Sequence, residues 1–264
     1  DYQNSEDPLT LDEHNLFYRL QTVFSHEEMM QYDRNPVIVH RDLYYESVGL
    51  FMARDSRLYL AVKGGDNDDS HNHNDVGSFT IYKDGKPLFI DAGVETYTKK
   101  TFSPDRYDIW TMQSRYHNLP TFVDHGRETV QQAGEQYCAA DVRYELGETA
   151  CRISMDIRQA YPDDRIRSYT REAVLEKEKS ITIRDHYEGD GGTAVLSLMF
   201  CEKPVIDQNT IRIGDLAVCA VEGASSITVE EIPVTDERLK TAWKHNLYRC
   251  LVTMEAHDLT LTIV

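Results

Sequence analysis

Residues 78–90 read SFTIYKDGKPLFI, two short stretches of apolar and polar residues on either side of Asp84-Gly85. An Asp-Gly pair between such stretches is a strong signal for a two-residue β-hairpin turn, because both residues tolerate a positive φ. The sequence therefore predicts one strand at Ser78–Tyr82 and its antiparallel partner at Pro87–Ile90.

The same kind of pattern continues along most of the chain. Short β-type stretches with turn signals at roughly 8–12-residue spacing are typical of an antiparallel β-sandwich. With 264 residues, 41% of them hydrophobic, the chain is long enough for one large sandwich of two or more stacked sheets. We therefore expect a mainly β fold, with further strands at Val48–Arg54, Leu58–Lys63, Tyr137–Leu146, Ala150–Ile157, Ser168–Leu175, Ser180–His186, Thr193–Phe200, Thr210–Ile213, Leu216–Glu222, Ser226–Ile232 and Arg249–Val264.

The N-terminal residues follow a helical pattern instead. Apolar residues at spacings of three and four follow Thr10, a suitable N-cap, with Glu13 completing a capping box. We expect residues 1–44 to be short helices and a linker, and residues 45–264 to form the β-sandwich. The first predicted helix is Leu11–Leu20, and a second, short one starts with the residues Ser25–Met30. A third is predicted at about Asp236–Trp243.

The net charge of −17 argues against some classes of partner. An acidic protein repels nucleic acid and anionic membranes, so we expect neither as a partner. Residues 71–127, in contrast, carry seven basic and seven acidic side chains and are neutral on balance. An anionic substrate would not be repelled from this segment.

Other sequence features bound the class of protein. The five cysteines are scattered without a C-x-x-C pair, so we expect small buried side chains rather than a disulfide framework. No apolar run approaches the ~18 residues that span a bilayer. Residues 1–7, DYQNSED, do not resemble a signal peptide, and because the chain does not begin with Met we expect it to be a fragment.

A group of metal-binding residue types surrounds the predicted hairpin. His71 and His73 precede it, and in an extended segment side chains two residues apart point to one face, so we expect both imidazoles on one face of a strand. Asp91 follows the hairpin, and His117 lies beyond a polar loop. Two histidines and an aspartate form a ligand set that zinc accepts, with a fourth position left open. The sequence therefore indicates a zinc site beside a spare histidine.

The loop at 91–118 is long for a compact domain, and such loops are usually functional. It contains Tyr97, Tyr107 and Tyr116. A tyrosine near a cation can act as an acid or base if its pKa of ~10 is lowered. Packing against Trp110 is the more common role for each of them.

Four segments carry a resemblance to a known family: VGLFMAR at 48–54, NHNDVGSF at 72–79, FIDAG at 89–93 and YHN at 116–118. They resemble the signature of the heparinase II/III-like polysaccharide lyases. This family has a helical (α/α) toroid followed by antiparallel β-sheets, and the resemblance is close over about 45–125. It implies that residues 1–44 are the tail of a missing N-terminal toroid domain and that residues 45–264 are the C-terminal β-sandwich domain.

The resemblance also implies roles for individual residues. Zinc would be bound by His73, Asp91 and His117, and His71 would be a catalytic residue. Tyr107 or Tyr97 would be a catalytic tyrosine. The implied chemistry is β-elimination at a uronic acid: a base removes the C5 proton, an acid protonates the leaving O4, and preorganised groups neutralise the adjacent carboxylate.

The expected function is therefore that of the metal-bearing C-terminal domain of a bacterial lyase acting on an acidic polysaccharide or oligosaccharide, such as a glycosaminoglycan. We expect it to be inactive without its N-terminal toroid, its partner within the same protein. If a signal precedes the fragment, the enzyme is periplasmic or extracellular; otherwise it is cytoplasmic. Two alternatives stay open, a noncatalytic carbohydrate-binding β-sandwich with a structural zinc and a zinc-dependent hydrolase in which the metal activates water.

Overall fold

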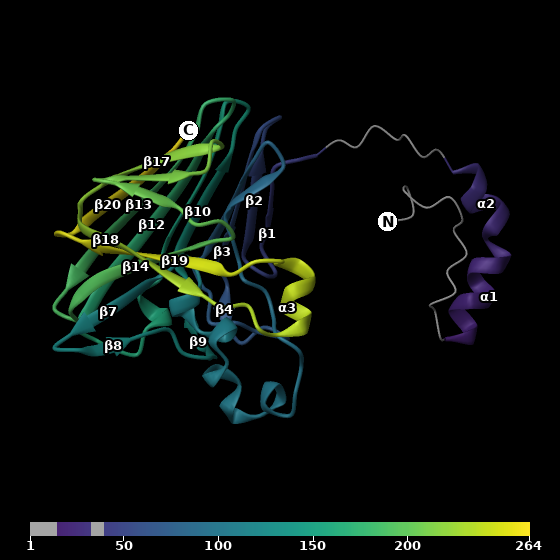
Figure 1. Cartoon of the computed structure of the whole chain (residues 1–264), viewed down its shortest axis with the longest axis horizontal. Helices are drawn as coiled ribbons and strands as arrows, with labels where there is room; N and C mark the ends of the chain where they lie inside the picture. Colours follow the sequence, from purple (N-terminus) through teal and green to yellow (C-terminus); the bar gives the residue numbers. More distant parts are fainter. Residues whose placement is uncertain (1–14, 33–39) are drawn as a thin grey trace. The chain divides into compact units, whose positions relative to one another are not determined.

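The computed structural model describes residues 15–32 and 40–264. The chain divides into two compact units, residues 1–40 and residues 41–264. Most of the second unit is strand, and its β-sheets are antiparallel, as the sequence predicts (Figure 1).

Helices α1 (Leu16–Phe24) and α2 (His26–Gln31) form the described part of the first unit. Helix α1 begins after Asn15, whose side-chain oxygen accepts a hydrogen bond from the Phe17 amide at 3.0 Å. The predicted cap Thr10 and the capping-box residue Glu13 lie outside the described residues. Neither α1 nor α2 buries a side chain.

Three larger sheets make up the second unit in the described part of the chain. The first has the strand order β1-β2-β3-β5-β6. Its strands are β1 (Leu43–Tyr45), β2 (Leu50–Arg54), β3 (Leu58–Lys63), β5 (Phe79–Lys83) and β6 (Lys86–Phe89). The β5–β6 turn confirms the predicted hairpin, because Asp84 and Gly85 have φ values of 50° and 75°.

The second and largest sheet has eight strands in the order β10-β11-β12-β13-β20-β17-β16-β15. They are β10 (Ala140–Leu146), β11 (Ala150–Asp156), β12 (Ile166–Glu176), β13 (Ser180–Gly189), β20 (Asp258–Ile263), β17 (Ala217–Glu222), β16 (Thr210–Ile213) and β15 (Val205–Asp207). The third sheet, in the order β18-β19-β14-β7-β8, comprises β18 (Ala224–Ile232), β19 (Leu247–Met254), β14 (Thr193–Phe200), β7 (Pro120–Asp124) and β8 (Arg127–Thr129). A two-stranded ladder pairs β4 (Asp66–Asn67) with β9 (Gly134–Cys138).

One continuous apolar core joins the three larger sheets. Strand β3 packs against β12 and β13, and β6 packs against β14. Along β3, Leu58, Leu60 and Val62 are buried while the residues between them are partly exposed. This period of two is what makes the segment a strand with one face in the core.

Three expectations about element boundaries need correction. The predicted strand Tyr137–Leu146 is divided after Cys138, because its first two residues belong to β9 and Ala140–Leu146 form β10 in another sheet. The C-terminal stretch Arg249–Val264 is not one strand, because a turn at 255–257 separates β19 from β20, which lie in different sheets. The loop 91–118 is not irregular throughout, because 3₁₀ helices form at Lys100–Phe102, Pro104–Asp108, Trp110–Met112 and Ser114–Tyr116. Such short turns leave no detectable hydrophobic period.

Other predictions about local structure are confirmed. Helix α3 (Glu237–Ala242) lies where a short helix is predicted, and the Asp236 side chain caps it by accepting a hydrogen bond from the Leu239 amide. All five cysteines are free; Cys151, Cys219 and Cys250 are buried as predicted, whereas Cys138 and Cys201 are only partly buried. Within residues 15–32 and 40–264, none of the helices has the length and hydropathy needed to cross a bilayer.

Candidate metal centre

Three side chains from separate segments meet beside the β5–β6 hairpin. His73 lies in the segment before β5, and Asp91 is the second residue after β6 ends at Phe89. His117 follows the last 3₁₀ helix of the long loop. One ligand atom from each lies within 4.8 Å of the others. Because bonds from zinc to nitrogen and oxygen are ~2.0–2.2 Å, two ligands of one ion lie at most about 4.4 Å apart. The three groups are therefore close to the separation that one ion requires.

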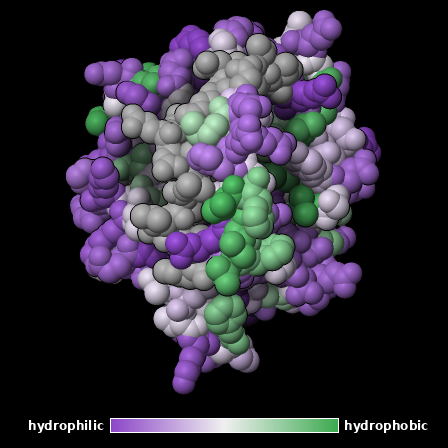
Figure 2. All heavy atoms as spheres, turned by 90° about the vertical axis from the view of Figure 1, so that its right-hand side faces the viewer, coloured by the Kyte–Doolittle hydropathy of each residue, from purple (hydrophilic) through white to green (hydrophobic). Residues whose placement is uncertain are grey.

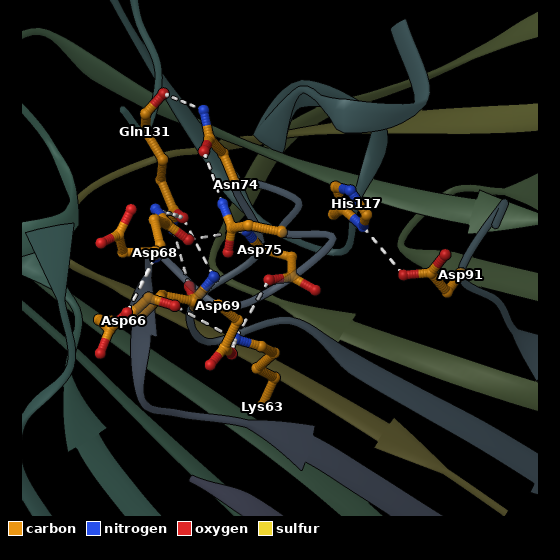
Figure 3. A network of polar contacts seen from close by, with 12 residues as sticks. Lys63, Asp66, Asp68, Asp69, Asn74, Asp75, Asp91, His117 and Gln131 are labelled. Atoms are coloured by element: carbon orange, nitrogen blue, oxygen red, sulfur yellow. Dashed lines mark hydrogen bonds and ion pairs between the residues drawn. The ribbon is translucent and has the colours of Figure 1, made fainter. Parts of the chain in front are cut away.

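His117 has the environment of a metal ligand. Its Nε2 lies 3.2 Å from the Thr111 carbonyl oxygen, so the proton sits on Nε2 and is donated there. The buried Nδ1 then presents a lone pair, and the atom has no hydrogen bond of good geometry. It faces the Asp91 Oδ2 at 3.1 Å, as Figure 3 shows. Two facing acceptors repel unless a proton or a metal ion lies between them, so the residues present fit a divalent cation.

The electrostatics of the three groups agree with this arrangement. Burial, together with the nearby charge of His117, lowers the pKa of His73 to about 4, which leaves a neutral imidazole free to bind a metal. Burial works against ionisation of Asp91 and His117. Their mutual attraction outweighs it, so the pKa of Asp91 lies well below its ordinary value and that of His117 lies above 6.5.

Asn118 fixes two of the ligand-bearing segments to each other. Its Nδ2 donates to the carbonyl oxygens of Phe79, at 2.6 Å, and of Ile90, at 3.1 Å. Its Oδ1 accepts a hydrogen bond from the Met199 amide at 2.7 Å. Because Asn118 follows His117 and Ile90 precedes Asp91, this fully buried amide sets the distance between two ligands. The sequence analysis missed this role, although the position of Asn118 beside a candidate ligand was a signal for it.

Arg171 of β12 ties the third ligand-bearing segment to the other two. Its Nη1 donates to the carbonyl oxygens of Gly77, at 2.8 Å, and of Asn118, at 2.7 Å. Its Nε and Nη2 bind the two carboxylate oxygens of Asp185 at 2.7 and 2.6 Å. The arginine is 1% exposed, so the pair is a buried, bidentate contact between the eight-stranded sheet and the site. No local sequence signal marks Arg171, since it lies far away in the chain.

The expected placement of the two neighbouring histidines on one strand face is wrong. Residues 70–75 form a turn and irregular segment, and His71 has a φ of 62°. A residue in this left-handed conformation interrupts extended backbone, so the alternation of side chains along a strand does not apply here. His73 turns inward to the metal cluster, whereas His71 is exposed and lies beside Tyr97.

The candidate tyrosines contact different residues. The Tyr97 hydroxyl lies 3.3 Å from the His71 Nδ1, and the two rings are nearly parallel at 5.9 Å. The Tyr107 hydroxyl instead accepts a hydrogen bond from the Asn72 side chain at 3.1 Å. Tyr116 packs edge to face with Trp110 at 5.1 Å.

The long loop is bound tightly to the histidine segment. The Arg106 guanidinium donates two hydrogen bonds to the Asn72 carbonyl oxygen, at 3.0 and 2.8 Å, and a third to the Thr101 carbonyl. Tyr107 lines a cavity of about 450 Å³ on this side, together with Asn74, Arg115 and other residues. Arg106 therefore fastens the long loop to the segment that carries His73.

A second polar network borders the metal cluster (Figure 3). The Lys63 Nζ lies 2.9 Å from the Asp69 carboxylate and 3.6 Å from that of Asp75, and it also donates to the Asp66 carbonyl. The buried Gln131 accepts hydrogen bonds from Asn67 and from the Val76 amide. This network holds the segment between β3 and β5 in place.

Comparisons with known proteins agree with this fold. Residues 39–249 match the family model described as heparinase II/III-like, C-terminal. No curated protein matches the chain. Among solved structures, one described as a heparinase III gene product is 16% identical with a TM-score of 0.65, over 94% of this chain and 39% of that one.

Another structure, the heparan sulfate lyase HepC from Pedobacter heparinus, is 18% identical with a TM-score of 0.64, again over 94% of this chain and 39% of the other. The chain thus spans well under half the length of these two structures. At these identities the likeness concerns the fold.

Proposed function

We propose that this chain, which belongs to the heparinase II/III-like C-terminal family, is the metal-bearing domain of a polysaccharide lyase. The proposed lyase cleaves uronic-acid-containing chains by β-elimination. The observation that carries the proposal is the convergence of His73, Asp91 and His117. A third histidine, His71, lies two residues before His73 in the chain and 3.3 Å from the Tyr97 hydroxyl.

The geometry supports zinc as the metal. Two neutral imidazole nitrogens and a carboxylate oxygen are ligands that zinc accepts. The Thr111 carbonyl oxygen accepts the Nε2 proton of His117, which leaves the Nδ1 lone pair available for the metal. When bound, zinc supplies positive charge beside the negative charge that develops during the reaction. His73, Asp91 and His117 would hold it.

The remaining residues offer acid–base chemistry. We assign His71 and Tyr97, 3.3 Å apart, as the pair that moves protons at the sugar, since both are accessible and share a hydrogen bond. In β-elimination the base takes the C5 proton and the acid gives a proton to the leaving O4. Tyr107 stays a second candidate, because it lines the neighbouring cavity.

A partner domain is part of the proposal. The chain spans 39% of the length of the similar lyases, and its own helical unit has an apolar surface, which Figure 2 shows as a band of hydrophobic side chains. The exposed apolar residues of α1 are Leu16, Phe17, Leu20, Val23 and Phe24. Water-exposed apolar surface of this kind is typical of a contact face. We propose that an N-terminal toroid domain covers it and completes the active site.

The test compares this chain with the longer protein that contains it. Both are incubated with heparan sulfate, alginate and other uronic-acid polymers, and ultraviolet absorbance reports the unsaturated sugar that elimination creates. We expect product from the longer protein alone. Saturated products that disappear with a chelator would instead establish the zinc-dependent hydrolase, and tight binding without any product from the longer protein would establish the carbohydrate-binding module.

A further inference from the structure

Helix α3 is fastened to the segment that follows Asp91. The Asp236 side chain, which caps α3, also accepts a hydrogen bond from the Thr96 amide at 3.0 Å. At the other end of the helix, the Trp243 indole Nε1–H donates to the Ala92 carbonyl oxygen at 2.9 Å. Two contacts between residues about 140 positions apart in the chain therefore hold α3 against the edge of the site.

This attachment places one cation beside the proposed acid–base pair. The Arg238 guanidinium carbon of α3 lies 4.6 Å from the centre of the Tyr97 ring, a cation–π contact. On the same tyrosine, the hydroxyl lies 3.3 Å from His71. Arg238, Tyr97 and His71 thus form a continuous chain of contacts along the accessible side of the site.

Arg238 also keeps its hydrogen-bonding capacity. It is exposed and makes no ion pair within the described ranges 15–32 and 40–264, although the chain carries a net charge of −17. Its neighbours on α3 behave differently, because Lys240 is paired with Glu237 at 2.6 Å. A guanidinium held on an aromatic ring keeps its planar fork of donors available for a carboxylate.

The same loop offers a surface for a sugar ring. Phe102 is 70% exposed and packs edge to face against Tyr97 at 5.5 Å. An exposed aromatic ring beside polar groups suits the apolar face of a pyranose, while the neighbouring guanidinium suits a charged substituent on it.

We propose that Arg238 binds the substrate carboxylate, pairing with the uronate whose C5 proton is removed and so determining the preference for uronic acids over neutral sugars. This inference rests on the proposed function and adds the residue that selects the substrate. A guanidinium on the carboxylate withdraws negative charge from it, which makes the adjacent C5–H more acidic. The base of the His71–Tyr97 pair takes the C5 proton, and the electron pair of the C–H bond forms the C4–C5 double bond. The C4–O4 bond breaks, its electron pair leaves with O4, and the acid protonates that oxygen.

The test measures binding of two matched ligands to the zinc-loaded chain by calorimetry or NMR titration. One ligand is a uronic-acid tetrasaccharide, and the other is the same tetrasaccharide with its carboxylates reduced to hydroxymethyl groups. The variants are Arg238→Ala and Arg238→Lys, with Arg212→Ala as the control. Arg212 is an exposed arginine on β16 in another sheet, so the control makes the same change in net charge away from the site.

We expect the unmodified chain to prefer the carboxylate form. Arg238→Ala should weaken binding of that form about tenfold and leave the reduced form within about twofold, because a charge-assisted pair is lost. Arg238→Lys should restore part of the difference, and Arg212→Ala should change neither. Zinc content and circular dichroism confirm that each variant is folded.

The two hypotheses fail in different ways. If the unmodified chain prefers the carboxylate form and Arg238→Ala keeps that preference, the assignment of Arg238 is wrong while the proposed function stands. If the unmodified chain binds both ligands equally or neither of them, uronic-acid recognition by this domain is refuted and the inference falls with it.

Discussion

At the scale of single residues, the site depends on three side chains that share one small volume. His73→Ala, Asp91→Ala and His117→Ala should each remove zinc, because each deletes one of three protein ligands. A ligand present at 100 times its Kd stabilises the folded state by ~2.7 kcal/mol, and the variants should lose that increment. Elemental analysis and thermal unfolding with and without zinc measure both effects.

The matched control for these substitutions is His186→Ala. His186 is a partly exposed histidine paired with Asp258 at 2.7 Å on the eight-stranded sheet. It should keep its zinc and its zinc-dependent stabilisation. Unchanged metal content in all three ligand variants would show that the cluster does not hold the metal.

Proton release gives a second residue-scale prediction. Near pH 6, His73 is already neutral because its pKa is about 4, whereas His117, with a pKa above 6.5, carries a proton that zinc must displace. Zinc binding should therefore release about one proton near pH 6 and fewer as pH rises through the His117 pKa. Calorimetry in buffers of different ionisation enthalpy measures the number. Release of no protons near pH 6 would contradict the assignment of His117.

Substitution of His71 should impair catalysis without affecting metal binding. Its side chain faces Tyr97 and not the metal cluster, so His71→Ala should keep about one zinc per chain. In the longer protein it should lower kcat by about 10²–10⁴-fold, the usual range for loss of an acid or base. Metal analysis measures the zinc content of the variant, and initial rates measure its kcat. Loss of zinc from this variant would mean that the roles of the two histidines are reversed.

At the scale of elements, the site is held by strands that carry no ligand. The β5–β6 hairpin places Asp91 and the long loop places His117. Strand β12 supplies Arg171, which binds the carbonyl oxygens of Gly77 and Asn118 in the segments that carry His73 and His117. A fully buried arginine of this kind stabilises a specific arrangement, since each of its three donor nitrogens binds at least one defined acceptor.

Removing that arginine should therefore cost far more than removing a neighbouring one. Arg171→Met leaves Asp185 buried without its partner and should lower the free energy of unfolding by ~3–5 kcal/mol. The control, Arg184→Met, breaks the exposed pair with Glu172 on the same sheet and should cost ~0–1 kcal/mol. Urea unfolding of both variants measures the difference. Equal costs would show that the buried pair is not a principal support of the fold.

At the scale of the whole molecule, the two compact units predict independent folding. Residues 41–264 contain the continuous core, the three larger sheets and the whole metal cluster. A chain that begins at Arg41 should therefore unfold cooperatively, bind zinc with unchanged affinity and have a Tm within a few degrees of the full chain. Calorimetry measures each quantity. A loss of cooperative unfolding would show that the helical unit belongs to the same folding unit.

Much of the fold was accessible from the sequence, because local chemistry decides it. The Asp84-Gly85 turn, the alternation along β3 and the Asp236 cap of α3 each act through nearby residues. Short strands such as β7 and β8 were missed, because they gain their stability from the strands beside them rather than from their own residues.

The sequence by itself determined the β-sandwich, because residue type, period and turn chemistry are local properties. Its short motifs also indicated the family and the candidate metal ligands His73, Asp91 and His117. Only the tertiary structure decided that His71 turns away from His73, that Tyr97 rather than Tyr107 meets it, and that distant residues serve the site. Arg171, Asn118 and Arg238 act on the site from β12, from the residue after a ligand and from α3. Their contacts depend on how the sheets and α3 pack, and no short-range pattern in the chain encodes that packing.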